Sequence, residues 1–137
     1  MEIKVFDSLP DEARRIRTDV FVDEQGFHDE FDETDKSALH LVAFDGNEAV
    51  ATARVFLDGR RCVIGRIAVI KRLRGTGIGS EIIKAAEREI IKSGNGCAYI
   101  HAQLRARGFY EKIGYTAFGE YEPDQGYPHI WMKKDLK

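Results

Sequence analysis

The residues from Lys71 to Glu87 read KRLRGTGIGSEIIKAAE, with three alternating glycines directly before a run of apolar residues at helical spacing. The apolar positions predict a helix with one buried face: Ile78, Ile82, Ile83, Ala86 and Ile90. The N-terminus of a helix presents backbone N–H groups without intrahelical partners, and the helix dipole favours an anion there. Glycine lets the backbone approach a phosphate closely, and Arg72 and Arg74 add positive charge. The segment therefore predicts a bound phosphate or pyrophosphate.

Two familiar phosphate-binding motifs are excluded at this loop. A P-loop ends in Gly-Lys-Ser/Thr, whereas Gly79 is followed by Ser80 and Glu81. The dinucleotide fingerprint needs a third glycine three residues after Gly77, and that position is Ser80. A glycine-rich helix start with no ligand remains the alternative.

The chain before the glycine loop predicts one helix and four strands. Residues 2–6 alternate polar and apolar side chains as a strand does, and helical spacing follows up to about Val22. Ser8 and Asp11 resemble a capping box, with Pro10 in the first turn. Three further strands, at residues 38–45, 49–58 and 62–70, are separated by the turn signals DGNE and DGRR. They predict an antiparallel meander.

The chain after the glycine loop predicts a strand, a short helix and a closing pair of strands. The long helix ends at SGNG, residues 93–96, and a buried-type strand follows at 97–103. Residues 104–114 form a short helix, and residues 115–121 and 128–134 the last two strands. The whole order predicts an α/β protein with a mixed sheet and helices packed on it.

Composition limits the class of protein. The 137 residues suit one domain, residues 1–137, and the net charge of −2 argues against an extended nucleic-acid surface. No apolar run approaches the ~18 residues of a membrane span, and the N-terminus lacks the apolar region of a signal peptide. Cys62 and Cys97 make no disulfide framework. We expect a cytoplasmic protein with reduced thiols, no membrane partner and no nucleic-acid partner.

Three ordered segments resemble the GNAT superfamily of N-acetyltransferases. Residues 72–77, RLRGTG, resemble the family's Arg/Gln-x-x-Gly-x-Gly/Ala signature, and GRIAV precedes them on the expected strand. Residues 109–115, FYEKIGY, look like the family's Phe-Tyr-Glu-Lys-x-Gly-Phe/Tyr segment. VFVDEQGF near the N-terminus and YPHIWM near the C-terminus look like the ElaA-like branch. The order of elements also matches the family fold across nearly the whole chain.

The resemblance implies acetyl-CoA as cosubstrate and no metal. It implies that the backbone of Ile67, Ala68 and Val69 pairs with the pantetheine arm, where this strand splays from the strand at 97–103. It places the pyrophosphate on the loop and first helical turn, formed by Arg72, Arg74, Gly75, Thr76, Gly77, Ile78, Gly79 and Ser80. Gln103 and the pair Phe109 and Tyr110 are also expected beside the cofactor.

The implied reaction is direct acetyl transfer to a primary amine of a small molecule or peptide. Tyr110 matches the family's general acid, and the Val69 backbone N–H is the family's usual donor to the developing oxyanion. Many members carry a glutamate base on the strand at 62–70, where this chain has Arg66. The base is therefore left open among five residues: Glu24, His28, His101, Glu120 and His129.

The acceptor is expected near the end of the first helix. Glu24, Gln25 and His129 are the predicted substrate-side residues. The segment from His28 to His40 holds five acids against one lysine, and is either a solvated loop or an acidic rim that attracts a cationic amine. Three other functions stay open: a non-catalytic acyl-CoA sensor, a nucleotide-binding regulatory module, and acyl transfer to a hydroxyl. A homodimer is compatible with the sequence.

Overall fold

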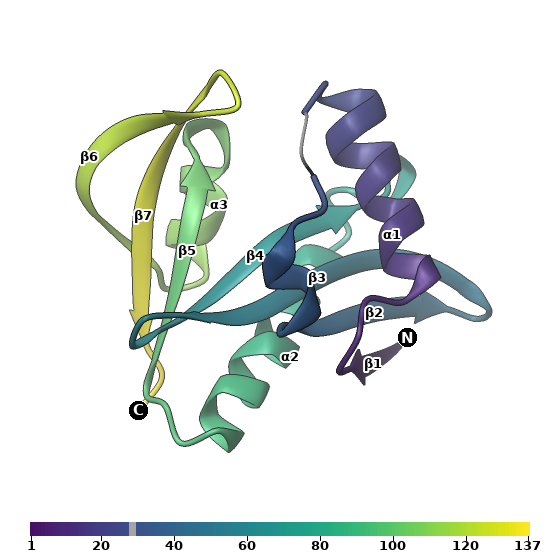
Figure 1. The fold of residues 1–137 in the computed structure, drawn as a ribbon, viewed down its shortest axis with the longest axis horizontal. Helices are drawn as coiled ribbons and strands as arrows, with labels where there is room; N and C mark the ends of the chain where they lie inside the picture. The colour runs from purple at the N-terminus through teal and green to yellow at the C-terminus, as the bar shows by residue number, and fades with distance from the viewer. Residues whose placement is uncertain (28–29) are drawn as a thin grey trace.

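The structure is a computed structural model that describes residues 1–27 and 30–137. One mixed seven-stranded sheet runs through it, in the order β1-β2-β3-β4-β5-β7-β6 (Figure 1). The strands are β1 (Glu2–Phe6), β2 (Leu39–Asp45), β3 (Glu48–Asp58), β4 (Arg61–Val69), β5 (Cys97–Gln103), β6 (Thr116–Asp124) and β7 (Tyr127–Asp135). The α-helices are α1 (Asp11–Arg17), α2 (Ile78–Lys92) and α3 (Arg107–Lys112). The predicted α/β fold with a mixed sheet is confirmed.

The predicted antiparallel meander is also confirmed. β2, β3 and β4 pair in sequence, and the two turns that join them contain Gly46 and Gly59 at positive φ. Asp-Gly turns of this kind match the right-handed twist of the strands that they connect. β1 extends this part of the sheet by pairing antiparallel with β2.

β4 and β5 are the only parallel neighbours in the described sheet, and their pairing is short. It covers Cys62 with Ala98 and Val63 with Tyr99. β4 continues to Val69 and β5 to Gln103, and beyond the paired positions the two strands diverge (Figure 1). The expected splay is therefore present, and it separates β1–β4 from the group β5, β7 and β6.

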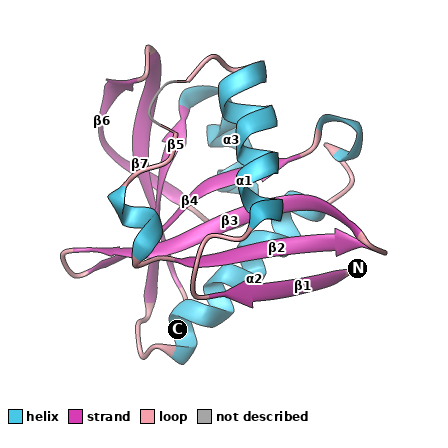
Figure 2. Ribbon diagram, turned by 45° about the vertical axis from the view of Figure 1, so that its right-hand side comes forward, coloured by secondary structure: helices cyan, strands magenta, loops and turns pink. Residues whose placement is uncertain are grey.

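Helices cover both faces of β2–β4 (Figure 2). The apolar face of α2 is buried as its spacing predicts, and Ile82, Ile83 and Ala86 are each fully buried in the main core. On the opposite face, Ile16 of α1 packs with Val42 of β2 and Ala68 of β4 in a second core. Because an apolar stripe is buried on each face of the sheet, the C-terminal end of β4 and the N-terminal end of α2 are held at fixed positions.

The first helix differs from its prediction at its start and in its geometry. Pro10 occupies the N-cap position and no side chain caps the helix, so the predicted capping box of Ser8 and Asp11 is wrong. α1 passes directly into a π-helical segment, η1 (Thr18–Glu24), so the helical run ends two residues after Val22, close to the predicted end. The wider π-helical turn continues the buried stripe through Val20 and Phe21. It brings the residues that follow it, Gln25 and Phe27, to the gap beside β4.

Candidate functional site

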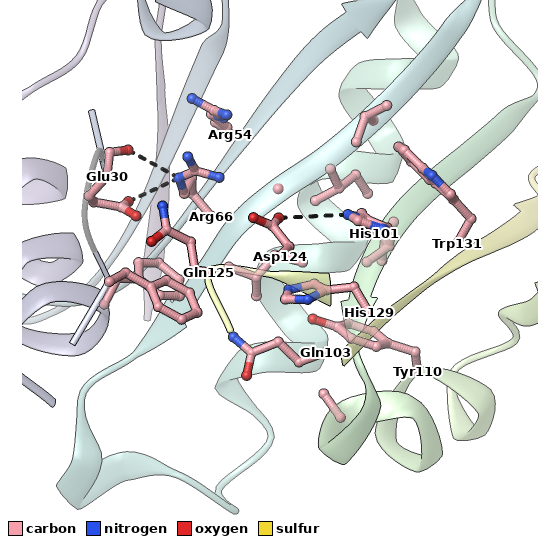
Figure 3. Close-up of a pocket in the computed structure, with 18 of the residues that line it drawn as sticks. Glu30, Arg54, Arg66, His101, Gln103, Tyr110, Asp124, Gln125, His129 and Trp131 are labelled. Carbon is pink, nitrogen blue, oxygen red and sulfur yellow. Dashed lines mark hydrogen bonds and ion pairs between the residues drawn. The ribbon is translucent and has the colours of Figure 1, made fainter. Parts of the chain in front are cut away.

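A cavity of about 420 Å³ opens where β4 and β5 diverge (Figure 3). Its walls come from four parts of the chain: the end of η1, strands β3 to β5, the start of α3 and the β6–β7 hairpin. Predicted cofactor and substrate residues meet here, since Ile67, Gln103, Tyr110, Gln25 and His129 all line it. Glu24, Val69 and the glycine loop are not among its lining residues.

The glycine loop has the backbone that an anion site requires. Gly75 and Gly77 have φ of 80° and 90°, and Gly77 is the N-cap of α2. The N–H groups of Ile78, Gly79 and Ser80 are in the first helical turn, where no intrahelical acceptor exists for them. Thr76 stabilises the loop by donating from Oγ1 to the Leu73 carbonyl at 2.5 Å. The loop therefore presents several N–H donors at the positive end of a 15-residue helix.

The two loop arginines are paired with glutamates. Arg74 makes two hydrogen bonds to Glu24, at 2.5 and 2.7 Å, and donates from Nε to the Val69 carbonyl at 3.0 Å. The hydrogen bond from Arg74 lowers the pKa of Glu24. Arg72 pairs with Glu48 at the surface. The positive charge of both arginines is thus neutralised, and the backbone N–H groups of the first turn of α2 are the donors left for an anion. The Arg74–Glu24 pair also joins the loop to the end of η1.

Within the described sheet, β4 has one edge without a strand partner beside the cavity, where Arg74 Nε donates to the Val69 carbonyl at 3.0 Å. Ala68 and Val69 pair with Thr52 and Ala51 of β3 on one side, while the described pairing with β5 stops at Val63. The backbone groups of Ile67–Val69 on the β5 side thus lie along the gap. An extended ligand with amide groups can pair with such an edge as an added strand does.

Tyr110 of α3 lines the cavity, whereas its neighbour Phe109 is not among the lining residues. Tyr110 is 8% exposed, and burial raises the pKa of its phenol well above the usual range. A phenol of that kind stays protonated and acts as a hydrogen-bond donor. Phe109 is more exposed and packs edge-on against Tyr110 at 5.3 Å between ring centroids. A Cβ added at Gly79 would lie 3.4 Å from the Phe109 ring, so this glycine allows α2 and α3 to approach closely.

Gln103 and Gln25 meet across the cavity. The Gln103 Nε2 group donates to Gln25 Oε1 at 3.0 Å, and Tyr127 donates its hydroxyl to the Gln25 carbonyl at 3.2 Å. Gln103 Oε1 is buried and accepts no hydrogen bond from any residue that the structure describes. A buried amide oxygen without a donor is costly, so it favours a ligand that carries an N–H group.

Two histidines lie next to each other on the wall formed by β5 and β7. The rings of His101 and His129 lie 5.0 Å apart between centroids, and His101 stacks on Trp131 at 4.7 Å. Burial, together with the neighbouring His129, lowers the pKa of His101, which keeps this ring neutral near pH 7. Trp131 lines the cavity as a wall residue. Of the other base candidates, Glu120 is exposed on β6, and His28 lies outside the described residues.

A buried network of arginines and carboxylates supports the opposite wall, which Glu30 and Arg54 of this network line. Arg17 is 1% exposed and donates to Glu30 Oε2 at 2.7 Å and to Asp35 at 2.8 and 3.1 Å. Arg54 of β3 donates to Asp32 at 2.7 Å and to Asp35 at 2.9 Å. Burial alone would raise the pKa of Asp35, but the hydrogen bonds and charges of Arg17 and Arg54 outweigh burial and lower it.

The sequence left two alternatives for this segment, a solvated loop or an acidic rim, and the network differs from both because Glu30 and Asp35 are buried and paired. Glu30, Asp32 and Asp35 are held by arginines, so they do not form a free negative surface for a cationic substrate. The sequence carried a signal that was missed: Arg17 stands four residues after Ala13 and three before Val20, on the buried face of its helix. Arg54 similarly interrupts an apolar strand.

Arg66 occupies the position where a glutamate base was considered. Its φ of 49° is left-handed, and Arg66 lies within the register irregularity of β4 against β3, between Gly65, the partner of Arg54, and Ala68, the partner of Thr52. Such a bulge turns a side chain away from the normal strand direction. Arg66 pairs with Glu30 at 3.1 Å and lines the cavity (Figure 3). Burial lowers the pKa of Arg66, and it raises the pKa of Glu30.

Residues 1–27 and 30–137 contain no cluster of three or more His, Cys, Asp or Glu side chains placed to bind a metal ion. None of the helices in this part of the chain is both long and apolar enough to span a membrane. Cys62 is buried and Cys97 half-buried, and both are free thiols.

Comparisons with known proteins agree with this geometry. A family model described as a GNAT acetyltransferase domain matches residues 7–136. The uncharacterized N-acetyltransferase YjcF of Bacillus subtilis is 35% identical over 127 residues, which is 90% of this chain and 91% of YjcF. ElaA of Escherichia coli is 30% identical over 129 residues, covering 89% of this chain and 84% of ElaA.

Solved structures share the fold. The crystal structure of Escherichia coli ElaA has a TM-score of 0.87 at 26% identity, covering 98% of this chain and 100% of that chain. An aminoglycoside 6'-N-acetyltransferase complexed with coenzyme A has a TM-score of 0.77 at 18% identity, covering 100% of this chain and 98% of that chain, and is similar in fold alone.

This chain belongs to the GNAT acetyltransferase family, and its sheet and helices form the acyl-CoA N-acyltransferase fold. The resemblance to the superfamily and to its ElaA-like branch is thereby confirmed.

Proposed function

We propose that the protein is an acetyl-CoA-dependent N-acetyltransferase that transfers an acetyl group directly to a primary amine of a small molecule or peptide. The observation that carries the proposal is the conjunction of the glycine loop with the β5-side edge of β4 and a cavity behind it. The first suits a pyrophosphate and the second suits an amide-containing arm. The cavity, lined by Tyr110, then has room for the acceptor.

The residues fit coenzyme A in three places. Within Arg74–Ser80, the backbone N–H groups after Arg74 are those that would hold the pyrophosphate. The Arg74 N–H donates to the Lys71 carbonyl at 3.3 Å, and the Arg74 side chain is neutralised by Glu24. The backbone of Ile67–Val69 would pair with the pantetheine amides. The unpaired Gln103 Oε1 would accept a hydrogen bond from an N–H group of the arm. Acetyl-CoA supplies an activated thioester, and no metal is needed for its attack by an amine.

Two residues are assigned to the leaving group and the oxyanion. The Val69 N–H would donate to the carbonyl oxygen as negative charge develops on it. Tyr110 would donate its hydroxyl to the departing thiolate. Because burial raises the pKa of Tyr110, full proton transfer to a thiolate is uphill, and the phenol acts by hydrogen bonding. Gln25 and His129 line the cavity and are the proposed substrate-side residues. Glu24 does not line the cavity, and its proposed part is indirect, because it holds Arg74 of the glycine loop.

The proposal is tested first by calorimetric titration with acetyl-CoA, coenzyme A and ATP. Ser80→Glu is the informative variant, because glutamate at the third helical position stabilises a helix and its charge opposes a phosphate. Ser80→Gln is the matched control, with a similar size and no charge. We expect Ser80→Glu to weaken coenzyme A binding at least about tenfold relative to Ser80→Gln, with no loss of thermal stability, as the charge repulsion requires.

Absence of binding to both coenzyme forms by the unmodified protein would refute the proposal. Equal affinity of the two Ser80 variants for coenzyme A would instead show that the phosphates do not bind at the N-terminus of α2. Preference for ATP over coenzyme A would favour a nucleotide-binding module. If binding is confirmed, release of coenzyme A in the presence of a panel of primary amines separates an enzyme from a sensor.

A further inference from the structure

We infer that His129 is the general base of the proposed reaction and that its Nε2 atom accepts the proton of the attacking amine. The inference rests on the proposed acetyl transfer. It starts from a single contact: His129 Nδ1 lies 2.9 Å from the Tyr127 carbonyl oxygen. A carbonyl oxygen only accepts hydrogen bonds, so Nδ1 must carry the hydrogen. In the neutral ring, Nε2 is then the atom with the free lone pair.

The position of the ring suits a base. His129 is 5% exposed and lines the cavity together with Tyr110 and Ile67, so it faces the space between the proposed acid and the β5-side edge of β4 (Figure 3). Within residues 1–27 and 30–137, no hydrogen-bond partner occupies Nε2. The lone pair is thus fixed in direction by the backbone on one side and open to the cavity on the other.

Several groups face the ring from neighbouring elements. On β5, Gln103 stands directly opposite His129, and the His101 ring lies 5.0 Å away between centroids. On β6, Glu122 is the register partner of His129, and Glu122 Oε1 lies 2.9 Å from His101 Nε2. Asp124 of β6, Arg105 and Tyr110 complete the lining on this side. These charged groups sum to one net negative charge when the histidines are neutral, which supports a transient imidazolium on His129.

Other base candidates are less well placed. Glu24 is held by Arg74, which lowers its pKa and makes it a poor proton acceptor. The pKa of His101 is lowered by burial and by His129 itself, so a charge on both rings is disfavoured. His101 is therefore a neutral neighbour of the base.

The proton and electron balance is simple. An alkylammonium acceptor at pH 7 loses its proton at a cost of roughly 4–5 kcal/mol in water, and a base at the site provides the acceptor for that proton. Nε2 takes this first proton, and the free amine then attacks the thioester carbonyl so that the N–C bond forms. The nitrogen loses its second proton to solvent as the C–S bond breaks. Coenzyme A leaves as a thiolate that takes a proton from solvent, and His129 returns the first proton to solvent, so one proton is released for each amide formed from an alkylammonium.

The tautomer is measurable without any substrate. Long-range ¹H–¹⁵N spectra of the full chain at neutral pH distinguish Nδ1–H from Nε2–H rings, and the His129 signals are assigned by their absence in His129→Asn. His40 is an internal reference of opposite kind, because its Nε2 atom faces the Asp35 carbonyl at 2.9 Å. We expect Nδ1–H for His129 and Nε2–H for His40. An Nε2–H ring at His129 would overturn the inference.

Kinetics then separate a base from a structural residue. Asparagine at 129 can keep the donor to the Tyr127 carbonyl while it removes Nε2, so the fold should be retained. Release of coenzyme A is followed with two acceptors: butylamine, which is protonated at neutral pH, and hydroxylamine, which is largely unprotonated there. We expect His129→Asn to lower kcat/KM about 100-fold or more with butylamine and less than about tenfold with hydroxylamine.

The control is His40→Gln. His40 is a buried histidine that does not line the cavity, and glutamine can keep a donor to the Asp35 carbonyl. This variant should change kcat/KM by the same factor with both acceptors. Equal losses with both acceptors in His129→Asn would overturn the assignment of a base. If acetyl-CoA binds and neither acceptor is acetylated, the proposed activity fails with these amines, and the tautomer measurement still decides the state of His129.

Discussion

Replacement of Arg17 by methionine tests whether the buried network holds the cavity wall. The Arg17 guanidinium is 1% exposed and donates four hydrogen bonds, three to the carboxylates of Glu30 and Asp35 and one to the Glu30 carbonyl. Methionine fills much of the same volume but leaves two buried carboxylates without this cation. Breaking a buried ion pair on one side generally costs about 3–5 kcal/mol.

The magnitude expected here lies near the lower end of that range. Asp35 keeps Arg54 at 2.9 Å, and Glu30 keeps Arg66 at 3.1 Å, so neither carboxylate is left without any partner. We expect Arg17→Met to lower the free energy of unfolding by about 3 kcal/mol. That is a large fraction of the about 5–15 kcal/mol that stabilises an ordinary domain.

The assay is urea unfolding at pH 7, followed by far-UV circular dichroism and by the fluorescence of Trp131, the one tryptophan of the chain. Arg15→Met is the matched control, because Arg15 lies on the exposed side of the same helix. The control should change stability by less than about 0.5 kcal/mol. A loss of less than about 1 kcal/mol in Arg17→Met would refute the reasoning that this charge network is needed to bury its carboxylates.

The remaining predictions concern the core, the loop, the acid and the pH dependence. Ile82→Ala, at a fully buried position of α2, should cost about 2–5 kcal/mol in urea unfolding, and a smaller loss would mean that the core collapses around the gap. Gly77→Ala should lower the Tm because φ is 90° there, whereas Gly108→Ala, in α3 with open space around its Cβ, should raise it slightly. Tyr110→Phe should keep the affinity for acetyl-CoA in calorimetry and slow turnover about 100-fold, and unchanged turnover would remove its role as an acid. Because the pKa of Asp35 in the folded protein lies below its usual 3.8, stability is complete above about pH 4 and falls as the pH drops through the folded pKa; a flat profile of unfolding free energy against pH would contradict this.

Local patterns predicted the elements well because they depend on neighbours in the chain. The spacing of Ile78, Ile82 and Ile83 is enough to place α2 and its buried face, and the turns at Gly46 and Gly59 are enough to place two hairpins. The resemblance to the family then added the splay between the strands at 62–70 and 97–103. The capping box failed because Ser8 is separated from the helix by Pro10, which takes the N-cap position itself.

Contacts between distant segments were not predictable in this way. Arg74 and Glu24 are fifty positions apart, and Arg54 reaches Asp32 across twenty-two. A count of charges in the acidic segment shows how many carboxylates exist but not which cations the fold brings to them. The hydrogen on His129 is a further example, since its placement follows from one backbone carbonyl and from no pattern of residue types.

The short seam between β4 and β5 has a mechanical consequence. Two paired positions, Cys62 with Ala98 and Val63 with Tyr99, are the backbone joint between the two parts of the sheet. We expect a joint of that length to resist sliding of the two strands more than rocking of one part of the sheet against the other. A ligand arm that bridges both strands beyond Val63 would act as a brace across this hinge. Amide hydrogen exchange at Ile67–Val69 and along β5 should therefore slow together when coenzyme A binds, while exchange in β2 and β3 stays unchanged.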